Sequence, residues 1–491
     1  MTEPSTGDRV ALSAVLVVFG ATGDLASRKL YPALAELAKR NQLPQKFAIV
    51  GVARTEMSDS DFAARAPELA ALGIGFQYVA GSFDDADTFE RLKKRLDDCD
   101  VKHGTAGNRL YYLATVPSGF AKVAAGLGAA GMADEPPGTF RRLVIEKPFG
   151  RDLESAEALD DQMHQYFDEH QIFRIDHYLA KETVQNILAL RFANAIFEPL
   201  WNRRYVDHVE LTVAESLGVG HRGTFYEQAG ALRDIVQNHL LQVLAVTAME
   251  PPASFAADAI RDEKVKLLKS VRPLQPWDLP QLVVRGQYVA GVEEGQEVPG
   301  YRNEEGVATD STTETFLALR LEIDNWRWAG VPFFVRTGKR LEHRVTEVAV
   351  RYKQVPFLPL PKSAVDSIEP NTTVIRIQPD EGIEVSFGAK IPGSPFQVRT
   401  VNLDFSYQES FDEPPPEAYQ RVIFDALQGD ATLFIRSDEV LQSWRIVMPL
   451  VEAFEHNALP LHFYEAGSWG PPEADELLRH HDRDHEHWRT P

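Results

Sequence analysis

The first third of the chain alternates short apolar runs with longer stretches that have the apolar periodicity of helices. The apolar runs that predict strands are residues 14–19, 47–52, 76–79, 109–113 and 141–146. Such continuous runs, rich in aliphatic residues, are typical of strands buried on both faces of a parallel sheet. Helical patterns lie between them, up to about residue 40, at 61–71, at 86–96 and after Pro117. This alternation predicts an α/β domain with a doubly wound parallel sheet.

Beyond about residue 175 the pattern changes from alternating elements to a succession of strands. Residues 206–215 alternate polar and apolar positions, as a half-buried strand does. The later strand-like runs are 281–288, 314–323, 333–337, 346–353, 373–377 and 382–387. Because few helical patterns separate them, a large and mainly antiparallel sheet is expected. Helical patterns at 181–200, 230–248 and 417–428 are expected to cover one face of that sheet.

The length of 491 residues exceeds that of a usual single domain, so two domains are expected. We predict a flexible N-terminal tail at 1–13, a doubly wound domain at 14–175, a β+α domain at 176–470 and a charged C-terminal tail at 471–491. Histidines recur near the end, between 480 and 487. They could bind metal adventitiously, but a solvated tail is the better interpretation.

Composition excludes several classes of protein. Acidic residues number 72 and basic residues 51, which gives a net charge of −21 and argues against a nucleic-acid partner. The single cysteine, Cys99, excludes an intrachain disulfide framework and a cysteine-rich metal site, and fits a reducing cytosol. The apolar run at 14–19 is too short for a signal peptide or a membrane span. We therefore expect a cytoplasmic protein without a membrane partner.

A glycine-containing turn follows the first predicted strand and leads into a helix. Gly20 and Gly23 would let backbone N–H groups approach a pyrophosphate at the helix N-terminus. The spacing is Gly-x-x-Gly rather than the full Gly-x-Gly-x-x-Gly, so a tight turn without a ligand remains an equal alternative. Arg54 lies just past the second strand, where sites that choose NAD usually place a carboxylate; an arginine there suits a 2′-phosphate.

Charged side chains also follow two later strands. Lys147 comes directly after the run 141–146 and is followed by Pro148. The stretch 174–182 follows a short apolar run and contains adjacent Asp176 and His177. In an extended chain these two side chains point to opposite sides, so we expect them to do different jobs. A charged surface turn is the ordinary alternative for such a segment.

Two further segments contain candidate chemistry. Between 230 and 244 an apolar stripe at helical spacing contains His239, with Asp234 about 140° away around the helix. A histidine at the edge of a core and near a carboxylate can act as a general base, although a satisfied core histidine is the usual case. The segment 333–344 runs from a strand into Gly338 and several cations. Composition alone favours a solvated loop there over a phosphate grip.

Taken together, these segments resemble the glucose-6-phosphate dehydrogenase family. The matching pieces run in family order over nearly the whole chain. They are Gly20-Ala-Thr-Gly-Asp-Leu-Ala26, Glu146-Lys-Pro-Phe-Gly150, Arg174-Ile-Asp-His-Tyr-Leu-Ala-Lys-Glu182, Phe192-Ala-Asn, Phe197-Glu-Pro-Leu-Trp-Asn202, Gly230-Ala-Leu-Arg-Asp-Ile-Val-Gln-Asn-His239, Asn325-Trp-Arg-Trp328 and Arg336-Thr-Gly-Lys339. The resemblance implies a Rossmann-type NADP-binding domain followed by a β+α substrate and oligomerisation domain with a large, mainly antiparallel sheet.

The resemblance also implies the reaction and its residues. Family members oxidise C1 of D-glucose 6-phosphate to the 6-phospho-lactone, the first step of the oxidative pentose phosphate pathway, and pass the hydride to NADP, with NAD as a weaker alternative and no metal. It implies that His239 is the base and that Asp176 pairs with it. The implied substrate-binding residues are Lys147, His177, Tyr178, Lys181, Glu215, Asp234, Lys339, Arg344 and Gln378. The implied coenzyme-binding residues are Gly20, Thr22, Gly23, Asp24, Leu25, Arg54 and Lys147.

The resemblance reverses the preference for a solvated loop at Lys339, and it implies a homodimer or homotetramer. One position departs from the family pattern, because Ala180 stands where the phosphate-gripping motif usually has glycine. Two other functions remain open. An oxidoreductase similar to glucose–fructose oxidoreductase would act on an unphosphorylated sugar and would need no pair like Asp176 and His239. A non-catalytic NADP-binding sensor would bind coenzyme without turnover.

Overall fold

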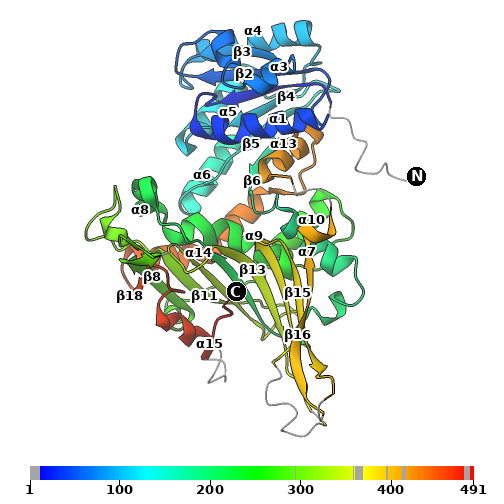
Figure 1. The fold of residues 1–491 in the computed structure, drawn as a ribbon. Coiled ribbons are helices and arrows are strands. Elements are labelled where there is room, and N and C mark those ends of the chain that lie inside the picture. The colour runs from blue at the N-terminus through cyan, green and yellow to red at the C-terminus, as the bar shows by residue number, and fades with distance from the viewer. Residues whose placement is uncertain are drawn as a thin grey trace. The chain divides into compact units, whose positions relative to one another are not determined.

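The computed structural model describes residues 12–293, 295–357, 359, 369–393, 396–411, 416–479 and 487–490. These residues form two compact units, and both are discontinuous in sequence (Figure 1). The first unit falls within Met1–Ala180, Pro252–Asp262 and Pro416–Leu441. The second falls within Lys181–Pro251, Glu263–Pro415 and Gln442–Pro491. The two units are described separately below.

The first unit is built on a seven-stranded sheet with the order β17-β6-β5-β4-β1-β2-β3. Its strands are β1 (Ala14–Phe19), β2 (Phe47–Ala53), β3 (Gly75–Ala80), β4 (Arg109–Leu113), β5 (Arg141–Ile145), β6 (Ile172–Ile175) and β17 (Phe434–Ile435). All neighbours pair in parallel except β17, which is antiparallel to β6. The chain reverses its direction of winding between β1 and β4, as in a Rossmann fold, where ligands bind at the carboxyl ends of the strands. The predicted fold class of this unit is therefore confirmed.

Helices connect these parallel strands. They are η1 (Ala26–Leu30), α1 (Tyr31–Lys39), α2 (Asp59–Ala63), α3 (Pro67–Ala71), α4 (Ala86–His103), α5 (Phe120–Ala129) and α6 (Leu153–His164). The single helix predicted at 61–71 is wrong, because two short helices occupy that region. Ser58 caps the first of them, and Pro67 begins the second. Proline lacks a backbone N–H and is tolerated only in the first turn of a helix, so it starts a new helix here.

A late segment of the chain belongs to the first unit. Helix α13 (Ala418–Gln428) packs on α1, and its residues Val422, Ile423, Ala426 and Leu427 are buried in the core of this unit. Strand β17 adds Phe434, whose ring lies 4.8 Å from that of Phe173. Figure 1 shows α13 in orange beside the blue α1. The expectation that 417–428 covers the antiparallel sheet is wrong, since an apolar helical stripe shows that a face is buried but not against which sheet.

The second unit is built on a nine-stranded sheet with the order β16-β15-β14-β13-β7-β12-β11-β8-β18. Its strands are β7 (Val206–Ala214), β8 (Val283–Val289), β11 (Phe316–Glu322), β12 (Pro332–Gly338), β13 (Val345–Tyr352), β14 (Thr372–Gln378), β15 (Gly382–Lys390), β16 (Val398–Ser406) and β18 (Leu461–Glu465). The sheet is mainly antiparallel, as predicted, with two parallel pairs, β7 with β12 and β8 with β18. The sequence prediction did not include β16 or β18.

The helices of this unit include α7 (Glu182–Phe192), α8 (Gly223–Ala231), η6 (Leu232–Leu240), α9 (Leu241–Ala248) and most of α14 (Ser437–Glu455). Of these, α7 packs on β14, and η6 packs on β7 and β12. The long helix predicted at 181–200 is wrong, because α7 ends at Phe192 and only a short turn, η4 (Glu198–Leu200), follows. The side-chain amide of Asn194 donates to the carbonyls of Ala189 (3.1 Å) and Leu190 (3.3 Å). The carbonyl of Leu190 is the one that the next backbone N–H of a continuing helix would have used, so the side chain takes the place of that bond.

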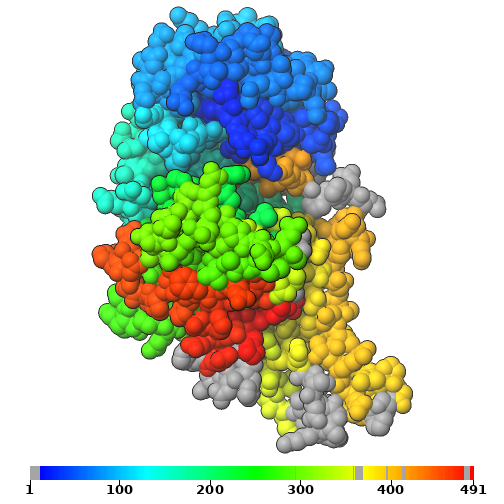
Figure 2. All heavy atoms as spheres, turned by 60° about the vertical axis from the view of Figure 1, so that its left-hand side comes forward, coloured from blue at the N-terminus to red at the C-terminus, as the bar shows by residue number. Residues whose placement is uncertain are grey.

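Residues after Gly470 pack on the second unit. Short helices η9 (Pro472–Asp475) and α15 (Glu476–Arg479) bring Leu477 and Leu478 into a core cluster that also contains Trp488. Figure 2 shows this segment in red against the body of the unit. Of the histidines near the end of the chain, those at positions 480, 481 and 485 lie outside the described residues. Among the described helices, none has the length and apolar character needed to cross a membrane.

Candidate active site

The predicted coenzyme turn lies at the carboxyl end of β1. Gly20 has a φ of +84°, and a Cβ there would lie 2.3 Å from the carbonyl oxygen of Ala114, so only glycine fits. The N–H of Gly23 donates to the carbonyl of Gly20 (2.9 Å), which closes the turn. The neighbouring predicted residues are partly buried Thr22 and Leu25 and exposed Asp24. The turn therefore brings a compact backbone surface to the start of a helix, where anions bind.

Two arginines lie near this turn. Arg54 follows β2 directly, is exposed, and forms no ion pair with any described residue. Arg65 donates to the carbonyl of Thr22 (3.1 Å) and to Oγ of Ser27 (3.2 Å), and so fastens α2 to the turn. Sequence reasoning missed Arg65, since its position beside the turn depends on how the short helices fold back.

Lys147 and Asp176 follow neighbouring parallel strands, β5 and β6, so both stand at the carboxyl edge of the sheet. The peptide bond between Lys147 and Pro148 is cis. The preceding Glu146 accepts a hydrogen bond from the hydroxyl of Tyr112 (2.5 Å), and burial raises the pKa of its carboxyl above the ordinary 4.5. The lysine thus follows a partly buried carboxyl group that is held by a buried tyrosine.

The turn after β6 begins with Asp176 and His177. Asp176 is only 1% exposed, and its Oδ1 accepts a hydrogen bond from the N–H of Tyr178 (2.9 Å). His177 is half-buried, and its ring meets the ring of Tyr178 edge-on at 5.1 Å. A carboxylate oxygen of Asp176 and a ring nitrogen of His177 nevertheless lie within 4.8 Å of each other, so the expectation that the two side chains point to opposite sides is wrong. That expectation assumed an extended chain, and the chain turns directly after β6. Different jobs for the two residues stay a prediction.

In the second unit, Glu215 and Lys339 follow the parallel neighbours β7 and β12, so they meet at one end of the sheet. The ammonium of Lys339 hydrogen-bonds to Glu215, lies 3.6 Å from Oδ2 of Asp234, and lies 5.4 Å from the centre of the ring of Tyr226. Lys339 is only 2% exposed. The solvated loop favoured by composition is therefore wrong at Lys339, because the chain buries this cation between two carboxylates.

A second group of predicted residues gathers at the same end of this sheet. Lys181 donates a hydrogen bond to Oε1 of Gln378, and a guanidinium nitrogen of Arg344 lies 3.4 Å from the same oxygen. The amide nitrogen of Gln378 donates to Oγ1 of Thr346 (2.9 Å) on the neighbouring β13. Gln378 therefore holds two cations close together, and such a pair suits an anion with several acceptor oxygens.

Asp234 and His239 lie on η6, a π-helical segment that packs on β7 and β12. Asp234 is 8% exposed and His239 is 1% exposed. The predicted single stripe is wrong, because every residue of η6 except Arg233 is buried. A π-helix has wider turns than the α-helix assumed by 100° spacing, and such turns are frequent at functional sites.

A buried acid fixes the start of η6. Glu314, which is 6% exposed, accepts a hydrogen bond at Oε1 from the N–H of Leu232 (3.1 Å), and its backbone carbonyl accepts one from the N–H of Ala231 (3.1 Å). Gly230, with a φ of +60°, lets the chain pass so close to this carboxyl that a Cβ would lie 2.3 Å from it. Sequence reasoning also missed Glu314, which lies far along the chain from the segment it holds.

The predicted residues are thus divided between the units. The first unit holds the glycine turn, Arg54, Lys147, Asp176, His177 and Tyr178, all at the carboxyl edge of its sheet. The second holds Lys181, Glu215, Asp234, His239, Lys339, Arg344 and Gln378. Within each unit the structure brings the predicted residues to one edge, where parallel strands end.

Models of protein families match nearly the whole chain. Residues 17–186 match the model described as glucose-6-phosphate dehydrogenase, NAD binding domain, and residues 188–489 match the C-terminal domain of the same enzyme. The chain belongs to the glucose-6-phosphate dehydrogenase family. The family is one of oxidoreductases, so the resemblance read from the sequence motifs is confirmed.

Curated relatives in this glucose-6-phosphate dehydrogenase family are similar along their full length. Glucose-6-phosphate 1-dehydrogenase 2 of Mycobacterium tuberculosis is 47% identical, over 98% of this chain and 96% of that protein. Glucose-6-phosphate 1-dehydrogenase of Aggregatibacter actinomycetemcomitans is also 47% identical, over 98% of both chains. The enzyme of Bacillus subtilis is 43% identical, over 97% of this chain and 98% of its own.

Solved structures of glucose-6-phosphate dehydrogenases also superpose on this chain. One, described as the enzyme in complex with its substrate glucose-6-phosphate, gives a TM-score of 0.88 at 34% identity and covers 98% of this chain and 100% of that one. The enzyme of Mycobacterium avium gives a TM-score of 0.82 at 38% identity, covering 98% and 99%. The predicted two-part fold is that of these glucose-6-phosphate dehydrogenases.

Proposed function

We propose that this chain oxidises the C1 hydroxyl of D-glucose 6-phosphate to 6-phospho-D-glucono-1,5-lactone and passes the hydride to NADP. The observation that carries the proposal is the arrangement at one end of the nine-stranded sheet. There, in a member of this family, Gln378 gathers Lys181 and Arg344 while Lys339 lies between Glu215 and Asp234. The first group suits a phosphate, and the second suits sugar hydroxyls.

The phosphate of the substrate is held by charge-assisted hydrogen bonds. Lys181 and Arg344 supply cationic donors, and the oxygen of Gln378 keeps them together before the phosphate arrives. His177 and Tyr178 add ring and hydroxyl donors from the turn after β6. Each such contact with a charged partner contributes about 1.5–3 kcal/mol. An unphosphorylated sugar would make none of these phosphate contacts.

The chemical step needs a base for one proton and an acceptor for one hydride. His239 removes the proton of the C1 hydroxyl, the C1–O bond becomes a carbonyl, and the hydrogen on C1 leaves with its electron pair. Asp176 supplies the anion that stabilises the protonated imidazole. Glu215 and Asp234 accept hydrogen bonds from sugar hydroxyls, and Lys339 offsets one of their two negative charges. Lys147 stands beside substrate and coenzyme and orients both.

The coenzyme supplies the hydride acceptor, and residues of the first unit fit it. The turn of Gly20, Thr22 and Gly23, continued by Asp24 and Leu25, offers backbone N–H groups to the pyrophosphate at the carboxyl end of β1. Arg54, exposed and without an acidic partner among the described residues, offers a planar fork of donors to a 2′-phosphate. NADP is therefore the preferred coenzyme and NAD the weaker one. The step requires no metal, since proton removal and a positioned acceptor suffice.

The protein's setting follows from the same function. The pathway step belongs to the cytoplasm, and the partner of the chain is a second copy of itself, in a homodimer or homotetramer built on the large sheet. The edge strand β16 offers an exposed apolar side chain, Leu403, for such an assembly. A molar mass in solution that is two or four times 55.0 kDa would support this state.

Replacing Lys181 tests the proposed phosphate grip. In K181A the KM for glucose 6-phosphate should rise about 10- to 100-fold, because one charge-assisted contact is lost, while kcat changes less. K269A is the matched control, since Lys269 is an exposed lysine of the same unit. Initial rates over a range of substrate concentration separate the two constants. An unchanged KM in K181A, or an equal rise in K269A, would contradict the assignment.

A further inference from the structure

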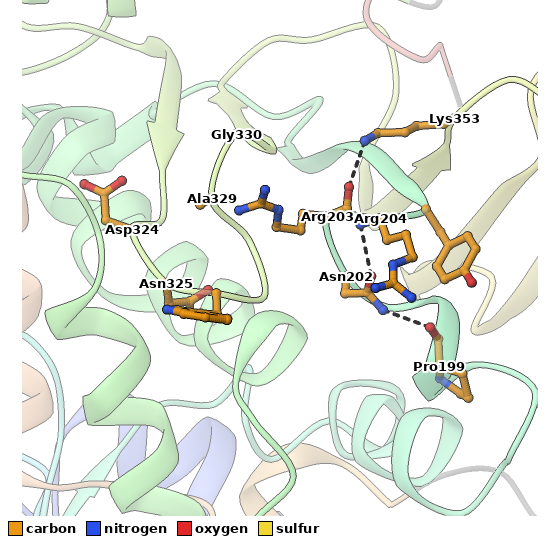
Figure 3. A pocket seen from close by; sticks show the side chains of 11 residues that line it. Pro199, Asn202, Arg203, Arg204, Asp324, Asn325, Ala329, Gly330 and Lys353 are labelled. Carbon is orange, nitrogen blue, oxygen red and sulfur yellow. Dashed lines mark hydrogen bonds between the residues drawn. The ribbon is translucent and has the colours of Figure 1, made fainter. Parts of the chain in front are cut away.

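A hollow that contains none of the candidate active-site residues opens on the second unit (Figure 3). Its volume is about 1290 Å³. Its walls are the turn that precedes β7, the loop between β11 and β12, and the residue that follows β13. It is lined by Pro199, Asn202, Arg203, Arg204, Tyr205, Asp324, Asn325, Trp326, Ala329, Gly330 and Lys353. The family roles discussed above use none of these residues.

Hydrogen bonds between the three segments build this hollow. The N–H of Arg203 donates to the carbonyl of Arg327 (2.7 Å), which joins the turn to the β11–β12 loop. The N–H of Lys353 donates to the carbonyl of Tyr205 (2.7 Å), and its ammonium donates to the carbonyl of Arg203 (2.8 Å). The side chain of Asn202 accepts the N–H of Arg204 (3.0 Å) and donates to Pro199 (2.8 Å). The walls are therefore fixed by backbone contacts, and these leave both guanidinium groups available.

The charge of the hollow is positive in a strongly acidic protein. Arg203, Arg204 and Lys353 line it, and among the described residues none of the three forms a salt bridge. The single acid of the lining is Asp324. It is paired with Arg272, whose guanidinium donates two hydrogen bonds to it (2.9 and 2.7 Å). Three uncompensated cations against a net charge of −21 make this hollow a local attractor for anions.

The hollow also presents an exposed aromatic surface. Trp326 is 98% exposed, although tryptophan has the largest apolar surface of any side chain, and Tyr205, which also lines the hollow, is 41% exposed. The neighbouring Trp328 is fully buried, so the β11–β12 loop directs one indole inward and one outward. An uncovered indole next to cations is the combination by which proteins hold a planar ring that carries phosphates.

We propose that this hollow binds a nucleoside di- or triphosphate. The base stacks on Trp326, and the phosphates are held by Arg203, Arg204 and Lys353. The hollow lies at the amino ends of β7 and β12, whereas Glu215 and Lys339 follow the carboxyl ends of the same strands. At about 3.3 Å per residue, the nine residues of β7 separate the two places by roughly 25–30 Å. The bound nucleotide is therefore a second ligand, distinct from the substrate.

Tryptophan fluorescence in the full-length protein, titrated with ATP, tests this proposal. All seven tryptophans belong to the second unit, and the W326F variant separates ATP bound in the hollow from ATP bound at the glycine turn of the first unit. We expect saturable quenching in the wild type and its loss in W326F. The double variant R203S/R204S should bind ATP at least about 10-fold more weakly, since two charge-assisted contacts are removed. The control R40S/K102S removes two exposed cations of the first unit and should bind as the wild type does.

The opposite outcomes would overturn the proposal. One is an unchanged dissociation constant in R203S/R204S; another is quenching that survives in W326F. Competition with inorganic tripolyphosphate, which has phosphates but no base, tests whether the base contributes to binding. If it displaces ATP with the same affinity as ATP itself, the base is not recognised and the hollow is a plain anion site, which contradicts the claim for a nucleotide. Kinetics with glucose 6-phosphate show that each variant is folded, because the substituted residues have no part in the proposed chemistry.

Discussion

Lys339 and its two acidic neighbours show how single residues shape the candidate substrate site. A buried ammonium costs several kcal/mol unless it is paired, and here Glu215 and Asp234 balance its charge while the ring of Tyr226 covers it. The same pairing holds both carboxylates in place beside the cation. Sugar hydroxyls are donors as well as acceptors, so a rigid set of carboxylates beside one cation matches their chemistry.

At His239 the expected effect of substitution is on the rate. H239N should lower kcat by about 10²- to 10⁴-fold while KM for the sugar phosphate changes little, because a general base is lost and the phosphate contacts remain. The control is H456N, which replaces an exposed histidine and should leave kcat unaltered. Steady-state kinetics give both constants. An H239N enzyme that keeps more than half of the wild-type kcat would show that another group takes the proton.

The same experiment extends to Asp176. If it supports His239, the double variant D176N/H239N should lose little more than H239N alone, since residues that act as one unit have non-additive effects. Additive losses would mean that Asp176 acts independently. The cycle therefore tests whether the two residues, which belong to different units, work on the same proton.

Coenzyme choice is expected to depend on Arg54. R54A should lose about 1.5–3 kcal/mol of NADP binding, or roughly 10- to 100-fold in kcat/KM, and leave NAD nearly unaffected, because only NADP carries the 2′-phosphate. Comparing kcat/KM for both coenzymes in wild type and variant measures the difference. Equal losses with the two coenzymes would show that Arg54 contacts a part they share.

Many individual residues of the candidate site could be found from the sequence, because they follow strands or sit in compact motifs. Lys147 comes directly after a predicted strand, Glu215 ends one, and Asp176 lies in the stretch that follows a short apolar run. The structure places each at a carboxyl edge. Arg65 and Glu314 could not be found in this way. Each acts on a segment far away in sequence, and nothing local marks an arginine that will reach a turn or an acid that will be buried.

At the scale of elements, the π-helix η6 holds two of the predicted site residues of the second unit. These residues are Asp234 and His239. The backbone N–H groups of Ala231 and Leu232, at the start of η6, donate hydrogen bonds to Glu314. Gly230 permits the sharp entry into this helix, with its φ of +60°. Glu314 thus sets where η6 begins, and through η6 it sets where the imidazole of His239 lies.

Substitutions of Glu314 separate hydrogen bonding from charge. E314Q keeps an oxygen that can accept the N–H of Leu232, so its kcat should stay near that of the wild type. E314A leaves this buried N–H without its acceptor, which costs about 1–3 kcal/mol in the free energy of unfolding, and it should lower kcat as η6 shifts. Denaturant unfolding and steady-state kinetics measure the two effects. Equal behaviour of E314A and wild type would contradict this role.

The burial of Glu314 predicts how the stability of the protein depends on pH. Burial raises the pKa of its carboxyl above the ordinary 4.5, so the folded protein holds the proton over a range in which the unfolded chain has lost it. The free energy of unfolding therefore falls as pH rises from the ordinary pKa towards the raised one. E314Q cannot ionise and lacks this fall. Its stability relative to the wild type should rise over that range, as unfolding at several pH values would measure.

The elements themselves were predicted best where periodicity is strong and worst where a local interaction ends a helix. The five strands of the doubly wound region agree closely with β1 to β5. The helices predicted at 61–71 and 181–200 extend through a break. The first breaks because Pro67 starts a new helix, and the second because the side chain of Asn194 bonds to the Leu190 carbonyl that the helix would need. The π geometry of η6 leaves no mark in a pattern read at 100° per residue.

At the scale of the whole molecule, the chain leaves the first unit and returns to it. Residues of Pro252–Asp262 and Pro416–Leu441 complete a unit whose main part ends at Ala180. The sequence pattern of α13 predicts a helix with one apolar face, and nothing in it distinguishes a parallel sheet from an antiparallel one. Sequence alone could therefore predict both sheets but not which late segments complete the first.

The central claim, a dehydrogenase that requires the phosphate of its sugar, is tested most directly by one set of initial rates. The absorbance of the reduced nicotinamide is followed with glucose 6-phosphate and with glucose, each combined with NADP and with NAD. We predict the highest kcat/KM for glucose 6-phosphate with NADP. The value for glucose should be lower by at least about 100-fold, because Lys181 and Arg344 lose their anion. Equal use of glucose and glucose 6-phosphate, or binding of NADP without any turnover, would contradict the account.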